Sequence, residues 1–278
     1  MTELVHLKMI LNIKILKMKQ LKICLLLLCI VAINSAVSAQ DTIRVKVMTY
    51  NLRFGELSSL EDLASQIKSF KPDFVALEEV DINPNRNIAP HQKGKNFINE
   101  LANKTGMFGL YGKTVNFSNG GYYGIGMLSK YPYITVQKTM LANPKNEEPR
   151  ALLQGLFEVG KDTIIFAATH LDVKDAATRD LQAQFICNNF EKSNYPVVIG
   201  GDFNARPNTN TIEKIMKKNW FNATNDDLSF PAWNPSIKID YIFCKPMKGW
   251  KVIKTQTVQS QLSDHLPVIT ELEYIRTK

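Results

Sequence analysis

The sequence is poor in cysteine, and its four cysteines have neither the spacing of a zinc site nor that of a disulfide framework. Cys24 and Cys29 fall in an apolar run near the N-terminus, which leaves Cys187 and Cys244 for the rest of the chain. Cys187 lies in a helical pattern and Cys244 at the end of a strand pattern. We therefore expect two buried free thiols, and no structural zinc.

The sequence also lacks a linker rich in Ser, Gly or Pro, a low-complexity tract and an internal repeat. Its 278 residues, 45% of them hydrophobic, suit one large globular domain or two small ones. Strand and helix signals continue from end to end after the N-terminal region. The sequence therefore predicts a single domain over residues 40–278.

No apolar run is long enough for an ordinary transmembrane helix of about 20 residues. The run Ile23–Ile33 follows several lysines and precedes Asn34–Ala39, which is the order of parts in a secretory signal peptide. Val37 and Ala39 suit the positions before a cleavage site. We expect a signal peptide over residues 1–39, cleavage before Gln40 and export to the periplasm, cell surface or medium. The alternative is an uncleaved N-terminal anchor.

Strong charge of one sign is also missing from the predicted mature chain. The full sequence has a net charge of +8, but residues 40–278 contain 29 basic and 25 acidic residues, a net charge of +4. A mild positive excess is compatible with a phosphate-bearing ligand and equally with an ordinary soluble surface.

The stretch Gly200–Asn204 contains polar residues that could bind a ligand or take part in catalysis. It follows the short apolar run Tyr195–Ile199, which has the pattern of a buried strand. Asp202 and Asn204 therefore stand where that strand emerges, which is the usual position of ligand sites in α/β proteins. The two glycines leave room for close approach of backbone or ligand. Taken alone, the same pattern is typical of a turn.

Other strand-like runs also begin or end in polar residues. These runs and one further cluster are Val45–Asn51, Phe74–Glu79, Thr163–His170, Ile239–Phe243 and Ser263–Pro267. Helical patterns separate several of them: Ser58 or Ser59 can cap a helix, and a second helix is expected over Asp175–Phe190. Strand hairpins thus alternate with helices in both halves of the chain.

In their order and residue types these motifs resemble the endonuclease/exonuclease/phosphatase superfamily, which includes deoxyribonucleases, inositol polyphosphate 5-phosphatases and neutral sphingomyelinases. The resemblance covers about Val45 to Leu272. It implies an α+β four-layer sandwich, with two mixed β-sheets packed face to face and flanked by helices. The alternation of strands and helices is compatible with this fold but does not by itself predict it.

The acidic and amide residues of the motifs offer only oxygen ligands, which suit Mg²⁺, with Mn²⁺ or Ca²⁺ as alternatives. The resemblance implies that Glu79 is the principal metal ligand and that Asp264 and Asn51 assist. It also implies that Asn204 orients a phosphate and that Asp202 lies by the attacking water or the leaving group. Asn51 could instead hold the phosphate.

Two histidines complete the predicted site. We expect His265 and Asp240 to form a histidine–carboxylate pair, in which the carboxylate fixes the tautomer of the ring. His170 resembles a separate phosphate-contacting histidine of the superfamily. Arg150 is either a phosphate clamp or part of a surface salt bridge, and Tyr123 either donates to a phosphate or packs in the core.

The function that the resemblance implies is hydrolysis of phosphodiester or phosphomonoester bonds by metal-assisted attack of water. Substrates left open are nucleic acids, phospholipid or sphingolipid head groups, and inositol or sugar phosphates. No obligate protein partner is implied, and we expect a monomer. The alternative is a non-catalytic binding module on the same fold.

Overall fold

The computed structural model describes residues 18–20, 22 and 42–276. The chain divides into two compact units, residues 1–42 and 43–278. In the first unit, residues 18–20 and 22 are helical and exposed. The predicted signal peptide and its cleavage site otherwise lie outside the described residues. Within the described part of the chain, no helix has the length and apolarity needed to cross a membrane.

The described residues of the second unit form two six-stranded sheets, as expected. The first has the order β11-β12-β1-β2-β4-β3. Its central pair, β1 and β2, is parallel, whereas β2, β4 and β3 pair antiparallel. The bounds are β1 (Thr42–Asn51), β2 (Phe74–Ile82), β3 (Phe108–Asn116), β4 (Tyr122–Ser129), β11 (Trp250–Thr257) and β12 (Val268–Ile275).

The second sheet has the order β5-β6-β7-β8-β10-β9, and again its central pair, β7 and β8, is parallel. Its other pairs are antiparallel, so both sheets are mixed. The bounds are β5 (Tyr133–Met140), β6 (Ala151–Val159), β7 (Asp162–His170), β8 (Val197–Asp202), β9 (Phe221–Asn222) and β10 (Asp240–Lys245).

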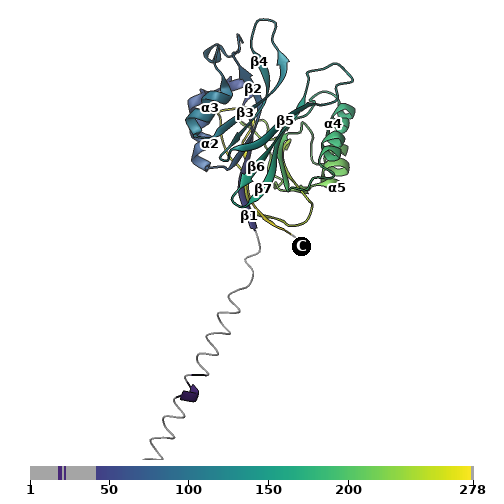
Figure 1. Cartoon of the computed structure of the whole chain (residues 1–278). Coiled ribbons are helices and arrows are strands. Elements are labelled where there is room, and N and C mark those ends of the chain that lie inside the picture. The colour runs from purple at the N-terminus through teal and green to yellow at the C-terminus, as the bar shows by residue number, and fades with distance from the viewer. Residues whose placement is uncertain (1–17, 21, 23–41, 277–278) are drawn as a thin grey trace, which may run out of the picture. The chain divides into compact units, whose positions relative to one another are not determined.

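Helices cover the outer face of each sheet, which gives the four layers (Figure 1). On the first sheet they are α2 (Leu60–Phe70) and α3 (Phe97–Thr105); on the second they are α4 (Ala176–Asn189), the π-helix η3 (Asn210–Met216) and the short α5 (Lys217–Asn219). Single 3₁₀ turns are η1 (Arg53–Gly55) and η2 (Pro90–Gln92). One buried cluster fills the space between the sheets, and a further cluster lies under each helical layer.

Local sequence explains where the helices begin. The Ser59 side chain accepts a hydrogen bond from the backbone N–H of Asp62, which caps α2 as predicted. Asp175 caps α4 through the N–H of Thr178 in the same way. The helix α2 ends at Lys71, which adopts a left-handed conformation just before Pro72.

The parallel strand pairs bring together the strand ends that carry the predicted site residues. In the first sheet, Asn51 at the end of β1 pairs in register with Glu78 of β2. In the second, His170 at the end of β7 pairs with Asp202 at the end of β8. A Cβ added to Gly200 would lie 3.0 Å from the Cβ of Ala76 on the other sheet. Glycine at this position thus allows the two sheets to approach closely beneath the strand ends, as the sequence predicts.

Candidate active site

A pocket of about 380 Å³ lies at the meeting point of these strand ends. Seven of the predicted site residues line it: Glu79, Arg150, His170, Asp202, Asn204, Asp264 and His265. Asn51 and Asp240 are fully buried behind this lining and bond to residues within it. Glu79 and His265, which are 186 positions apart in the sequence, thus line the same cavity.

Asp202 is the centre of the hydrogen-bonding network. Its Oδ2 lies 3.3 Å from Asn51 Nδ2, 3.4 Å from His170 Nε2 and 3.7 Å from His265 Nε2. Its Oδ1 accepts the backbone N–H of Asn204 at 2.8 Å. Burial, together with the neighbouring Asp240 carboxylate, raises the pKa of Asp202 to about 7. This carboxyl group can therefore take up or release a proton near neutral pH.

His265 forms the predicted pair with Asp240. Its Nδ1 lies 3.0 and 3.2 Å from the two carboxylate oxygens, so Nδ1 is the donor and Nε2 faces Asp202. Ser229 donates a further hydrogen bond to Asp240, which fixes the carboxylate. Burial lowers the pKa of His265, but the attraction of Asp240 and Asp202 outweighs it and raises the pKa to about 10. The ring is therefore positively charged at neutral pH.

His170 has the opposite electrostatic character. Its Nδ1 lies 2.8 Å from Arg150 Nη1, and an arginine can only donate, so Nδ1 accepts and Nε2 carries the proton. Burial and the positive charge of Arg150 lower the pKa of His170 well below its usual value. The site thus holds one charged and one neutral histidine, and both direct Nε2 toward Asp202.

Arg150 forms a salt bridge, one alternative left open by the sequence, and also lines the pocket. Its Nη1 lies 3.0 Å from Glu148, a salt bridge at the surface, yet the side chain is buried and lines the pocket. Its Nε is buried and has no hydrogen-bond partner. A buried donor without a partner is costly. An anion bound in the pocket would offset part of this cost by its attraction to the buried, positively charged guanidinium.

Glu79 does not end its strand, as the sequence suggested, because β2 continues to Ile82. The pairing with β4 shifts between Leu77 and Val80, and Glu79 has a left-handed φ of 57°. This bulge turns Glu79 into the pocket and its neighbour Glu78 into the space between the sheets. There, burial raises the pKa of Glu78 well above its usual value, and Thr49 donates to one of its oxygens at 3.1 Å.

Asn51 orients two of the predicted residues. Its Nδ2 donates to Glu79 at 3.1 Å and faces Asp202, whereas its Oδ1 accepts the backbone N–H of Arg53 at 2.9 Å. The amide nitrogen rather than the oxygen thus faces the carboxylates. In this arrangement the Asn51 amide nitrogen positions Glu79 and Asp202, while its oxygen bonds to the backbone of Arg53.

Asp264 is held by a residue that the sequence analysis did not single out. Arg53 Nη1 donates to its Oδ2 at 2.7 Å, and Arg53 also pairs with Glu56. Both Arg53 and Phe54 have left-handed φ angles, of 44° and 42°. Strained backbone of this kind is found where surrounding contacts impose it, often at functional sites. No pattern in the sequence marks Arg53, because its partner lies 211 positions away.

The carboxylates of the site fit a divalent cation. Burial raises the pKa of Glu79, and only the Asn51 amide, a neutral group, hydrogen-bonds to it. The Asn51 hydrogen bond and the positive charges of His265 and Arg150 lower this pKa in part, whereas the nearby negative charge of Asp264 raises it further. A cation bound by Glu79 and Asp264 would offset both the burial of Glu79 and the repulsion between the two carboxylates. A second group with ligand atoms within 4.8 Å of one another, Asp202, Asp240 and His265, lies beside them.

The remaining two predictions have different outcomes. Asn204 lines the pocket, and its side-chain amide donates to the carbonyl of Leu171 at 3.0 Å. Tyr123 is not among the residues that line the pocket. It packs against the Phe117 ring and under the Arg86 guanidinium, so the structure favours the packing alternative for this tyrosine.

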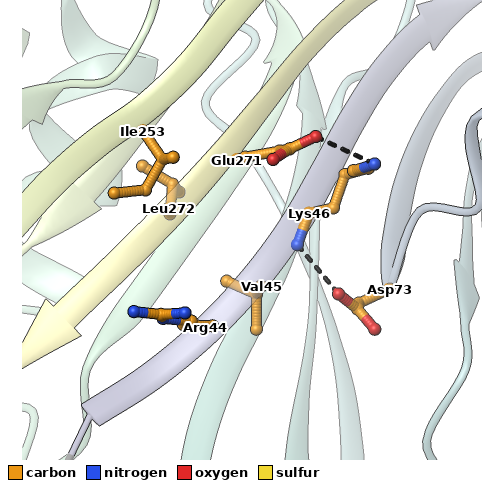
Figure 2. A pocket seen from close by; sticks show the side chains of 7 residues that line it. All are labelled: Arg44, Val45, Lys46, Asp73, Ile253, Glu271 and Leu272. Carbon is orange, nitrogen blue, oxygen red and sulfur yellow. Dashed lines mark hydrogen bonds and ion pairs between the residues drawn. The ribbon is translucent and has the colours of Figure 1, made fainter.

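A second hollow, of about 300 Å³, lies on the first sheet between β1, β11 and β12 (Figure 2). Its charged residues are already satisfied: Lys46 Nζ pairs with Glu271 at 2.9 Å, and the Lys46 N–H donates to Asp73. Lys46 is five residues before Asn51 along β1, roughly 17 Å at the rise of a strand. This hollow is therefore separate from the candidate active site.

The chain is similar to known proteins more clearly in fold than in sequence. No curated protein sequence matches the chain significantly. Several solved structures share its fold. An endonuclease/exonuclease/phosphatase family protein from Bacteroides thetaiotaomicron is 14% identical, with a TM-score of 0.69 over 86% of this chain and 100% of the other.

Two further structures are similar. A mannosyl-6-phosphatase from Bacteroides thetaiotaomicron is 16% identical, with a TM-score of 0.66 over 82% of this chain and 99% of the other. The human Nocturnin catalytic domain with bound sulfate is 18% identical, with a TM-score of 0.65 over 85% and 97%. These identities establish the fold alone. The sequence profile of the Endonuclease/Exonuclease/phosphatase family, however, matches residues 48–265, and the chain therefore belongs to that family.

Proposed function

We propose that this chain is a divalent-metal-dependent phosphoesterase. The observation that carries the proposal is the convergence of Asn51 and the Nε2 atoms of His170 and His265 on one carboxyl group, Asp202, whose pKa lies near 7. A proton-accepting group poised near neutral pH, between a charged and a neutral histidine, is suited to activating water. A binding module would not need this arrangement of proton donors and acceptors.

The two histidines have different roles in this proposal. His265 is positively charged and held by Asp240, so it stabilises negative charge that develops on the phosphate oxygens. His170 is neutral and donates from Nε2, so it orients Asp202 or a phosphate oxygen. Asp202 accepts the proton of the attacking water or returns one to the leaving oxygen.

Glu79 and Asp264 are the residues that would hold Mg²⁺ or Mn²⁺. When bound, the ion neutralises charge on the phosphate and so favours attack by water. Asn51 keeps Glu79 in place for this purpose, and Arg53 does the same for Asp264. Arg150, whose side chain lines the same pocket, holds the phosphate.

Similar structures support a phosphate ester as substrate without selecting one. One is a mannosyl-6-phosphatase, and Nocturnin binds a sulfate anion in its structure. A lipid head group would call for exposed apolar side chains near the pocket. Of the four aromatic residues from Trp220 to Trp233, Trp220 is buried, Phe221 and Phe230 are partly buried, and only Trp233 is mostly exposed. The apolar Val173, which lines the pocket, is also exposed, and two such side chains are a small surface for a membrane, so we favour a soluble phosphate ester.

Hydrolysis assays test the proposal directly. Chromogenic mono- and diesters, plasmid DNA, sphingomyelin, sugar phosphates and inositol phosphates are incubated with the protein and Mg²⁺ or Mn²⁺, with and without excess EDTA. We expect hydrolysis that EDTA abolishes and that Glu79→Gln abolishes while circular dichroism shows an intact fold. Full activity after dialysis against EDTA would exclude the metal assignment, and no hydrolysis of any ester would favour the binding module.

We also propose that the protein is exported, on the basis of the lysines, the apolar run and the Val37–Ala39 exit described above. N-terminal sequencing of the protein purified from its native cells should give a chain that begins near Gln40. A mature chain that retains residues 23–33 would contradict this proposal.

A further inference from the structure

Arg206 belongs to a rigid loop that follows the strand β8. The carbonyl of Ala205 accepts a hydrogen bond of 3.0 Å from the buried Tyr241 hydroxyl. The carbonyl of Arg206 itself accepts the Thr209 hydroxyl at 2.7 Å and the Thr209 N–H at 3.1 Å. Pro207 then restricts the next φ angle. The position of the Arg206 side chain is therefore set by a backbone that is fixed on both sides.

The side chain itself has no partner among the residues that the structure describes. It is exposed and lines the candidate active-site pocket. All seven arginines of the sequence lie in the described ranges. The other six each bond to a carboxylate or to a backbone carbonyl: Arg44, Arg53, Arg86, Arg150, Arg179 and Arg276. Arg206 is thus a cation that the fold itself does not use.

The pocket lining contains two arginines and four apolar residues. Arg150 lies with the catalytic histidine His170 and is buried, whereas Arg206 is at the exposed part of the lining. Val173, Phe230, Ile237 and Ile239 complete the lining. A phosphate held by Arg150 and the catalytic groups would place the organic part of its ester against these apolar side chains. The rest of the ester would then lie within reach of Arg206.

We propose that Arg206 binds a second anionic group of the substrate, a phosphate or a carboxylate. This inference rests on the proposed function, because it takes the scissile phosphate to lie at Asp202 and the two histidines. It narrows the substrate to phosphate esters whose compact organic part carries another negative group. A guanidinium suits such a group because it can donate two parallel hydrogen bonds to a phosphate or carboxylate.

The test compares two stable ligands that differ by one carboxylate: phenylphosphonate and 3- or 4-phosphonobenzoate. Calorimetry in the presence of Mg²⁺ measures the Kd of each for the wild type, Arg206→Gln and Lys192→Gln. Lys192 is a matched control because it is exposed, does not line the pocket and loses the same charge. We expect the wild type and the control to bind at least one phosphonobenzoate about tenfold more tightly than phenylphosphonate.

In Arg206→Gln this preference should disappear, while the affinity for phenylphosphonate stays within about twofold. Arg206→Lys should retain part of it, because the charge remains but the paired donors are lost. Equal affinities of the wild type for both ligands, no binding of either, or a preference that survives Arg206→Gln would each overturn the inference. The readout is binding, so failure here is distinct from an absence of hydrolysis, which would contradict the proposed function.

Discussion

At the scale of single residues, the site contains two histidines whose surroundings favour opposite charge states. His265 and His170 are both buried and both face Asp202 through Nε2. The partner on Nδ1 makes the difference: a carboxylate on His265 and an arginine on His170. The carboxylate favours the charged ring, and the arginine favours the neutral one. The residue bonded to Nδ1 thus decides which histidine is positively charged and can neutralise negative charge in the pocket.

We predict that His265→Ala and Asp240→Asn damage the same step. Asp240 acts on the reaction through His265, so each change should lower turnover of a chromogenic ester by about a hundredfold or more. The double variant should be little worse than the worse single one, because residues that act as a unit are not additive. Losses that simply multiply would show that Asp240 does not act through His265.

A second prediction concerns Lys238, which is buried and bonds to Thr224 and to the carbonyl of Asn225. Burial lowers its pKa from 10.5 to about 8, although Asp226, Asp240 and Asp227 act to raise it and Lys217 acts to lower it. Between pH 8 and 10.5 the unfolded chain then binds more protons than the folded one. The free energy of unfolding should therefore rise with pH in this window, by up to roughly 3 kcal/mol.

Urea denaturation of the wild type and of Lys238→Met at several pH values between 7 and 10.5 checks this. The methionine variant cannot titrate, so its difference in stability from the wild type should shift in favour of the wild type as the pH rises through this window. A difference that stays constant across the window would contradict the lowered pKa.

At the scale of elements, local sequence predicted the helices and the buried strands better than the irregular segments. The caps Ser59 and Asp175 were identifiable because they act on N–H groups only three residues ahead. The strand β5 was not predicted, since its residues are exposed on both faces except for the partly buried Thr139 and show no period of two. The two-residue strand β9 has too few residues to give a pattern.

In the candidate site, too, the sequence identified some residues and not others. The acidic residues and histidines were identifiable because each directly follows or precedes an apolar run. The supporting residues Arg53 and Ser263 were not, because their contacts join distant parts of the chain. The bulge at Glu79 was hidden for a related reason: it depends on how β2 pairs with β4, and no glycine marks its left-handed residue.

The irregular segment between β2 and α3, which contains Arg86, gives a prediction. The Arg86 guanidinium packs over the rings of Phe54 and Phe117, at 4.2 and 4.5 Å, and donates two hydrogen bonds to the fully buried Asp81. It therefore supports the left-handed turn that carries Arg53. Arg86→Leu should lower the free energy of unfolding by about 2–4 kcal/mol, because it leaves a buried carboxylate unpaired.

Chemical denaturation of Arg86→Leu measures this loss. Adding Asp81→Asn to it should recover part of the stability, since the unpaired charge is then removed. If the single variant were as stable as the wild type, the pair would be a surface contact without energetic weight.

At the scale of the whole molecule, the two sheets are built alike. Each has a parallel pair at its centre, and the ends of those pairs supply Asn51 and the Glu78–Glu79 bulge from one sheet and His170 and Asp202 from the other. The residues of the candidate site therefore stay in place only as long as the two sheets stay packed. Ligand binding at this junction should consequently stabilise the entire domain.

We predict that Mg²⁺ or Mn²⁺ raises the melting temperature of the wild type. A ligand that binds only the folded state at one hundred times its Kd adds about 2.7 kcal/mol. Glu79→Gln should abolish most of this shift, while Lys192→Gln, with an exposed side chain outside the pocket, should keep it. Differential scanning calorimetry after EDTA treatment and dialysis makes the comparison, and an equal shift in the Glu79 variant would exclude Glu79 as a ligand.

The order of strands also affects how the chain can fold during its synthesis. The strand β12 follows all the other described strands in the sequence and lies between β11 and β1, so β1 has an open edge until β12 has been made. Asp264 and His265 come immediately before β12. A nascent chain therefore lacks both the strand that completes the first sheet and two residues of the site. Completion of the sheet and the first appearance of activity should be a single, late event.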